Sequence, residues 1–160
     1  MKDRPIVSYC LFTYNQELYV RESLEAALHQ TYSPLEIIIS DDCSSDHTVR
    51  ILKEIINPYS GPHEIILNVN DQNLGIGAHV SKVMMELCSG DYIVMVGGDD
   101  VSFVDHVETG FASLIEFSSD PRHISRDLRT RQAPIERGIN ALACLECQTT
   151  NSFYLLTRHE

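Results

Sequence analysis

Short apolar runs alternate with longer amphipathic stretches over residues 1–117 of the chain. The apolar runs are rich in isoleucine and valine, which is typical of strands buried in a sheet. We expect strands at four places: Ile6–Phe12, Leu35–Ser40, Glu64–Val69 and Asp91–Val96.

The stretches between these runs repeat apolar residues at helical spacing. We expect helices over Glu17–His29, Asp46–Ile56, Ala78–Cys88 and Val104–Phe117. Strands that alternate with helices form parallel sheets whose two faces are both covered. The pattern therefore predicts an α/β fold, with a mostly parallel sheet and helices on both of its faces.

Residues 121–160 do not follow this pattern. Only Ile139–Leu145 and Phe153–Leu156 are apolar there. Residues 1–120 hold six basic and 19 acidic residues, whereas residues 121–160 hold six arginines and four acidic residues. We expect a domain over residues 1–120, followed over residues 121–160 by an atypical basic tail that is either disordered or not native to the domain. A functional basic arm is the weaker alternative.

Composition narrows the class of protein. A net charge of −11 argues against a non-specific nucleic-acid binder, which needs a basic surface. No apolar run reaches the roughly 20 residues of a membrane helix, and no secretory signal is evident. Five irregularly spaced cysteines indicate no disulfide framework, so we expect a reducing cytoplasm. We interpret the C-x-x-C pair Cys144 and Cys147 as a coincidence.

Polar side chains follow the ends of the predicted strands. Ligands bind at the carboxyl ends of parallel strands, near the point where the strand order reverses. Six residues are predicted to meet there: Thr13, Asp41, Asp42, Asn73, Asp99 and Asp100.

Two pairs of adjacent carboxylates stand out in this set. Asp41 and Asp42 end a buried strand, where they need partners such as a nucleotide base N–H or ribose hydroxyl. Capping of the next helix is the alternative, and it is stronger for Asp41. Asp99 and Asp100 follow two glycines, and such a loop suits Mg²⁺ or Mn²⁺ shared with substrate phosphates. Its alternative is a solvated turn.

Four histidines on predicted helices or loops show no metal-ligand spacing. We interpret all four as surface or half-buried residues: His29, His47, His79 and His106.

Three blocks of sequence together resemble the family 2 glycosyltransferases, inverting enzymes with the GT-A fold. The first is Val7–Glu17, with its Thr-Tyr-Asn-x-Glu loop. The second, Gln30–Thr48, is the most specific and resembles Q-T-Y-x-x-x-E-I-I-I-x-D-D-x-S-x-D-x-T. The third joins Asn73–Gly75 to Ser89–Asp100 and is similar to the family's N-x-G loop and D-x-D-type metal loop. The resemblance spans residues 5–117.

The resemblance implies roles for individual residues. Thr13, Tyr14 and Glu17 would line the nucleotide pocket, and Asp42 would accept a hydrogen bond from a base N–H such as that of uracil or thymine. Asn73 would hold the nucleotide side of the cleft. Asp99 would also contact the donor and, together with Asp100, place Mg²⁺ or Mn²⁺ on its diphosphate.

The chain departs from the family pattern at several positions. Gly97 replaces the first Asp of D-x-D, Phe12 replaces a proline, and Val80 stands where an arginine is common. Residues 121–160 contain neither the Glu-Asp pair nor the Q-x-x-R-W motif of the family's second half. We therefore expect a truncated GT-A domain without an assignable general base.

The resemblance implies transfer of a sugar from a UDP- or dTDP-type donor to a glycan or lipid-linked acceptor. The expected setting is polysaccharide or cell-envelope synthesis in the cytoplasm, with peripheral association at the inner face of the membrane. A non-catalytic nucleotide-binding module or assembly partner is the alternative. A nucleotidyltransferase ranks last, because the loop from Thr13 to Glu17 lacks basic residues.

Overall fold

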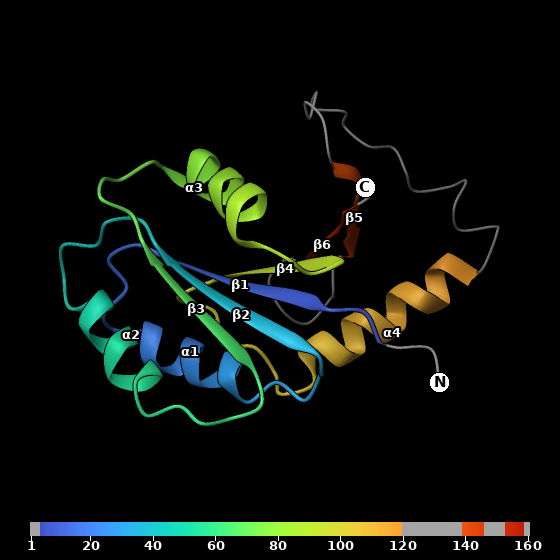
Figure 1. Cartoon of the computed structure of the whole chain (residues 1–160), viewed down its shortest axis with the longest axis horizontal. Coiled ribbons are helices and arrows are strands. Elements are labelled where there is room, and N and C mark those ends of the chain that lie inside the picture. The colour runs from blue at the N-terminus through green and yellow to red at the C-terminus, as the bar shows by residue number, and fades with distance from the viewer. Residues whose placement is uncertain (1–3, 120–138, 146–152, 159–160) are drawn as a thin grey trace.

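The computed structural model of the chain describes residues 4–119, 139–145 and 153–158, which contain one six-stranded sheet (Figure 1). The strand order is β3-β2-β1-β4-β6-β5. The first four strands are parallel, while β6 runs antiparallel to β4 and β5 antiparallel to β6. Their bounds are β1 Val7–Thr13, β2 Leu35–Asp41, β3 Glu64–Val69, β4 Tyr92–Gly97, β5 Ile139–Leu145 and β6 Phe153–Arg158.

Helices cover both faces of the parallel strands, as predicted. Helices α1 (Val20–Leu28), α2 (Thr48–Ile56) and α4 (His106–Ser119) lie on one face, and α3 (Ile76–Lys82) lies on the other (Figure 1). A short π-helix over Val83–Leu87 continues α3. None of the helices in the described part of the chain is both long and apolar enough to cross a membrane.

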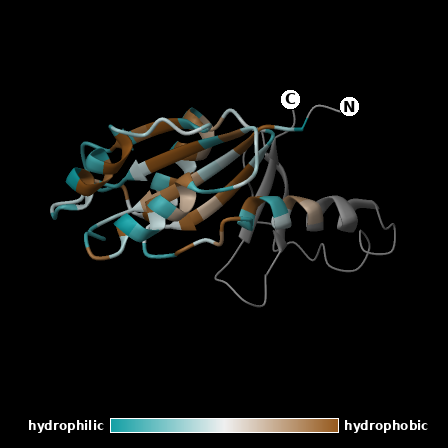
Figure 2. Ribbon diagram, turned by 90° about the horizontal axis from the view of Figure 1, so that it is seen from below, coloured by the Kyte–Doolittle hydropathy of each residue, from teal (hydrophilic) through white to brown (hydrophobic). Residues whose placement is uncertain are grey.

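The alternation of side chains along each strand divides the core in two. On β1, Val7, Tyr9 and Leu11 belong to the cluster beneath α1, α2 and α4, whereas Cys10 and Phe12 belong to the cluster beneath α3. Figure 2 shows hydrophobic residues concentrated in the strands. Both faces of the central strands are thus buried, which explains their nearly continuous apolar sequence.

Glu36 is a charged residue within this apolar core, and only 4% of its surface is exposed. Its carboxylate accepts hydrogen bonds from the Ser89 hydroxyl at 2.5 Å, the Ser89 N–H at 2.7 Å, the Gly90 N–H at 3.2 Å and the Ser8 hydroxyl. A Cβ at residue 90 would lie 2.7 Å from the backbone nitrogen of Ser8, so only glycine fits. Because Ser89 and Gly90 lead into β4, Glu36 fixes where β4 begins beside β1.

All four predicted helix starts were wrong by two or three residues: α2 begins at Thr48 rather than Asp46, and α4 at His106 rather than Val104. Helix α1 begins at Val20 rather than Glu17, because the residues before it form a tight turn in which the Tyr19 N–H donates to the Gln16 carbonyl oxygen at 3.0 Å. Helix α3 begins at Ile76 rather than Ala78, and after Lys82 it continues as the short π-helix.

The two apolar runs within residues 121–160 form β5 and β6. Strand β6 joins the sheet through β4, with Tyr92 paired to Thr157 and Val94 to Leu155. The division of the chain at residue 120 stays a prediction, and Cys147 of the C-x-x-C pair lies outside the described residues.

Candidate functional site

The strand order places a switch point between β1 and β4. The chain passes from β1 outward to β2 and β3, then crosses back to place β4 on the other side of β1. Thr13 pairs with Asp41 at the end of β2, and Phe12 pairs with Gly97 at the end of β4. The polar residues predicted at the strand ends therefore do follow the carboxyl edge of one sheet, where open α/β folds bind ligands.

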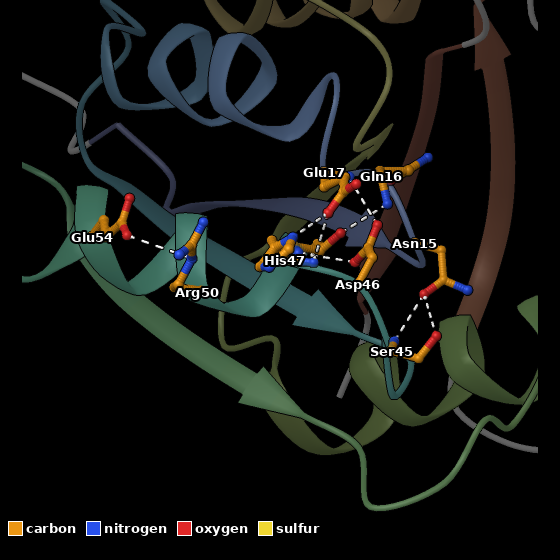
Figure 3. A network of polar contacts seen from close by, with 9 residues as sticks. Asn15, Gln16, Glu17, Ser45, Asp46, His47, Arg50 and Glu54 are labelled. Carbon is orange, nitrogen blue, oxygen red and sulfur yellow. Dashed lines mark hydrogen bonds and ion pairs between the residues drawn. The ribbon is translucent and has the colours of Figure 1, made fainter.

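The loops after β1 and β2 hold each other through reciprocal hydrogen bonds (Figure 3). The Asn15 N–H donates to the Ser44 hydroxyl, and the Ser45 N–H donates to Asn15 Oδ1, both at 2.8 Å. Asn15 has a φ of 51°, a left-handed conformation that asparagine tolerates. The Gln16 N–H donates to Thr48 Oγ1, also at 2.8 Å.

Glu17 completes this pairing of loops. Its carboxylate accepts the His47 N–H at 2.9 Å and lies 2.7 Å from His47 Nδ1, while its own N–H donates to Asp46 at 3.1 Å (Figure 3). The hydrogen bonds from His47 lower the pKa of the Glu17 carboxyl. The shared motif residues of the two loops thus have a structural function, and lining of a nucleotide pocket by Glu17 stays a prediction.

Asp41 and Asp42 are both buried but bind different partners. Asp41 accepts the Thr13 hydroxyl at 2.9 Å, the Ser44 N–H at 2.7 Å and the Ser44 hydroxyl at 2.5 Å. It therefore closes its own turn and ties that turn to β1. Neither carboxylate caps α2, because the N–H of Thr48 at the start of that helix donates to Asp46. The capping alternative is wrong for both residues.

Asp42 instead binds the loop that follows β3. It accepts the Asn70 side-chain amide and the N–H groups of Leu74 and Gly75, each at 2.9 Å. Burial raises the pKa of Asp42, but these hydrogen bonds outweigh burial and leave the pKa below its ordinary value. Asp42 is therefore an ionised acceptor that holds the loop across the end of β2.

Asn73 and Tyr14 are both exposed. Asn73 lies in the loop that Asp42 holds, and its side-chain oxygen accepts the Gly75 N–H at 2.9 Å. Gly75 has a φ of 74°, which favours glycine there. Tyr14 lies beyond β1 with 48% of its surface exposed. Both side chains are accessible to a ligand, whereas Thr13 is almost fully buried.

The Asp99–Asp100 loop packs closely against the β1 loop. The Gly98 N–H donates to Phe12 O at 2.7 Å, and a Cβ at residue 98 would lie 2.2 Å from Gln16 Oε1. Gln16 Nε2 donates to Asp99 Oδ1 at 3.0 Å. Gln16 therefore links the two strands that flank the switch point, a role not predicted from the sequence.

Asp99 and Asp100 direct their carboxylates toward the same place. A Cβ at Gly97 would lie 2.8 Å from Asp99 Oδ1 and 3.2 Å from Asp100 Oδ2. The missing side chain of Gly97 thus leaves a space flanked by two carboxylate oxygens. Within the described residues, no group of three or more His, Cys, Asp or Glu side chains gathers as metal ligands. Two carboxylates do suit Mg²⁺ or Mn²⁺ when substrate phosphates supply further oxygens.

His79 contradicts its prediction as a surface or half-buried residue. It is 2% exposed, and its Nε2 lies 2.7 Å from the Ser40 hydroxyl. Its ring meets Phe12 edge-on, with centroids 5.2 Å apart. Ser40 could have indicated the burial of His79, because a hydroxyl at a buried strand position needs a polar partner from the covering helix.

Comparison of the sequence with known proteins identifies a family. The sequence profile described as "Glycosyl transferase family 2" matches residues 8–124. The chain is 37% identical to chondroitin synthase of Escherichia coli over 120 residues, which cover 75% of the chain and 16% of that protein. It is 33% identical to glycosyltransferase GlyA of Streptococcus pneumoniae over 107 residues, or 67% of the chain and 15% of that protein.

Solved structures share the fold. A fragment of TarS of S. aureus (residues 1–349) superposes with a TM-score of 0.59 at 25% identity, over 71% of the chain and 33% of that fragment. A Pyrobaculum calidifontis mannosyltransferase solved with GDP-Man and Mn²⁺ also gives 0.59, at 20% identity over 75% of the chain and 34% of that protein. The chain spans less than half the length of these relatives. With the family profile covering most of its length, the chain belongs to glycosyl transferase family 2.

Proposed function

We propose that this chain binds the nucleotide-diphosphate sugar in a glycosyl transfer reaction, in the synthesis of a polysaccharide or other cell-envelope glycan. The observation that carries the proposal is that Asp42 follows β2 while Asp99 and Asp100 follow β4, so that these carboxylates lie at the carboxyl ends of the two strands that flank β1. The acceptor would be a glycan or a lipid-linked sugar, and the setting the inner face of the cytoplasmic membrane.

Asp42 suits the base of the donor nucleotide. An ionised carboxylate offers about four acceptor positions, and the three N–H groups from Asn70, Leu74 and Gly75 leave room for one more. The imide N–H of uracil or thymine is a donor of the required kind. Thr13, Tyr14, Glu17 and Asn73 would border the same nucleotide.

Asp99 and Asp100 suit the diphosphate end of the donor. They would hold Mg²⁺ or Mn²⁺, which would offset the negative charge that develops on the leaving nucleotide diphosphate. Gln16 supports this role, because its amide holds Asp99 against the β1 loop. We assign no general base for deprotonating the acceptor hydroxyl.

Calorimetric titration of the chain with UDP, dTDP and GDP, with and without Mn²⁺, tests the proposal. We expect a uracil or thymine nucleotide to bind and Asp42→Asn to weaken that binding at least tenfold, since a charge-assisted hydrogen bond contributes about 1.5–3 kcal/mol. Asp71→Asn changes an exposed carboxylate on the neighbouring loop and serves as the control.

Asp99→Asn with Asp100→Asn should remove the effect of Mn²⁺ on UDP affinity while leaving metal-free binding intact. Absence of binding by all three nucleotides, or equal binding by the Asp42→Asn variant, would refute the proposal. Thermal unfolding of each variant separates loss of binding from loss of the fold.

A further inference from the structure

A network of buried and half-buried polar side chains lies behind Asp42, and most of its hydrogen bonds have no part in the site described above. It begins at His79 on α3, whose Nε2 lies 2.7 Å from the hydroxyl of Ser40 on β2. It continues through the amides of Asn68 and Asn70 at the end of β3 and reaches both Asp42 and Lys82.

Lys82 and Asp42, the charged members of this network, fix the direction of its hydrogen bonds. The Lys82 ammonium can only donate, and it lies 2.7 Å from Asn70 Oδ1. The Asp42 carboxylate can only accept, and Asn70 Nδ2 donates to it at 2.9 Å. The amide of Asn70 therefore has one possible orientation, with its oxygen toward Lys82 and its nitrogen toward Asp42.

This orientation of the Asn70 amide determines the direction of the other hydrogen bonds in the network. Asn70 Oδ1 also accepts from Asn68 Nδ2 at 3.1 Å, and the same nitrogen donates to the Ser40 hydroxyl oxygen at 2.9 Å. Ser40 accepts from Asn68, and among the hydrogen bonds of its hydroxyl within the described residues only the one to His79 Nε2 offers an acceptor for the Ser40 proton. His79 is then neutral, with an unprotonated Nε2 and its proton on Nδ1.

The network also contacts both ends of the loop that Asp42 holds. Asn70 opens that loop, and α3, which carries His79 and Lys82, begins at Ile76 just after it. We propose that His79 is a positioning residue, which acts through Ser40, Asn68 and Asn70 to keep the loop over residues 70–75 seated on Asp42. The consequence for nucleotide affinity rests on the proposed function of Asp42.

Nitrogen NMR of the ligand-free, ¹⁵N-labelled chain tests the direction of the hydrogen bonds. The ring signals of His79 are assigned by their loss in His79→Gln. We expect a neutral ring with the proton on Nδ1 at pH 7. A ring protonated on Nε2, or a charged ring, would overturn the proposal.

Amide hydrogen exchange tests the seating of the loop. In Ser40→Ala and His79→Phe, the Leu74 and Gly75 amides that donate to Asp42 should exchange about fivefold to tenfold faster, as expected for the loss of one net hydrogen bond. The amides of Asn15 and Gln16, in the other pair of loops, serve as controls. His79→Gln retains an acceptor and should restore slow exchange; unchanged exchange in both disruptive variants would contradict the proposal.

Nucleotide titration separates this proposal from the proposed function. If UDP binds, Lys82→Met should weaken it about fivefold to tenfold, while Lys53→Met, an exposed lysine on α2, should not. Equal affinity of the Lys82→Met variant and the wild type would count against positioning. If no nucleotide binds the wild type, the proposed function fails, and the ring state and loop exchange still decide the role of His79.

Discussion

At the scale of single residues, neighbours decide what a carboxylate does. Asp41 and Asp42 are adjacent and equally acidic in sequence, yet one closes its own turn and the other holds the distant loop that begins at Asn70. The sequence predicted that both would lie at a strand end, because an apolar run must stop where charge begins. It could not predict their partners, since these come from separate parts of the chain.

Gly98 offers a test at this scale. Gly98→Ala would place a Cβ 2.2 Å from Gln16 Oε1 and 2.6 Å from Thr13 Cγ2, so Gln16 must move away from Asp99. We expect a loss of about 1–3 kcal/mol in unfolding free energy, as for other overpacked sites. Urea denaturation measures this loss.

Gly77→Ala is the matched control for Gly98→Ala. It lies in α3, and a Cβ there would meet nothing within 4 Å. Alanine should therefore stabilise the protein by about 0.5–1 kcal/mol through its better helix propensity. Equal effects of the two substitutions would show that the space around Gly98 does not matter.

At the scale of elements, the sequence predicted strands better than helix ends. The bounds of β3 were correct, because Glu64–Val69 is set off by polar residues on both sides. The start of α1 was wrong because the residues before it form a tight turn, whose first N–H groups donate to Asp46 in the loop after β2 and to Thr48 at the start of α2. Contacts with such a distant part of the chain leave no mark in the local pattern of apolar residues.

Glu36 provides the prediction at this scale. Glu36→Ala would leave the buried N–H and hydroxyl donors of Ser8, Ser89 and Gly90 without their acceptor. We expect a loss of about 3 kcal/mol or more in unfolding free energy, measured by urea denaturation. Glu64 occupies the paired position on the edge strand β3 and is exposed. Glu64→Ala should change stability by less than about 0.5 kcal/mol, and a similar loss in both variants would contradict the role given to Glu36.

At the scale of the whole molecule, two buried histidines and the half-buried His106 make stability depend on pH. Burial lowers the pKa of His63 and His79, and it lowers the pKa of His106 to about 4. An unfolded histidine titrates near pH 6.5. The unfolded chain therefore binds more protons below that value, and stability should fall as pH drops from about 6.5 toward 4.

Thermal unfolding followed by circular dichroism at pH 7, 6, 5 and 4.5 measures this dependence. The melting temperature should decrease over the range, before most carboxylates begin to titrate. His106→Gln should flatten the decrease, whereas substitution of the exposed His29 should not. A melting temperature that stays constant or rises toward pH 4.5 would disagree with the buried state of these histidines.

The strand order also sets the sequence of events during synthesis. Val7 pairs with Leu35 on one side, whereas its partner on the other side is Tyr92, which lies much farther along the chain. Closing the longer loop costs more chain entropy, and the N-terminal part leaves the ribosome first. Strands β1 to β3 can therefore assemble while β4 is still being made. The site between β1 and β4 is completed only when β4 takes its place, so nucleotide binding would report that β4 of a newly made chain has paired with β1.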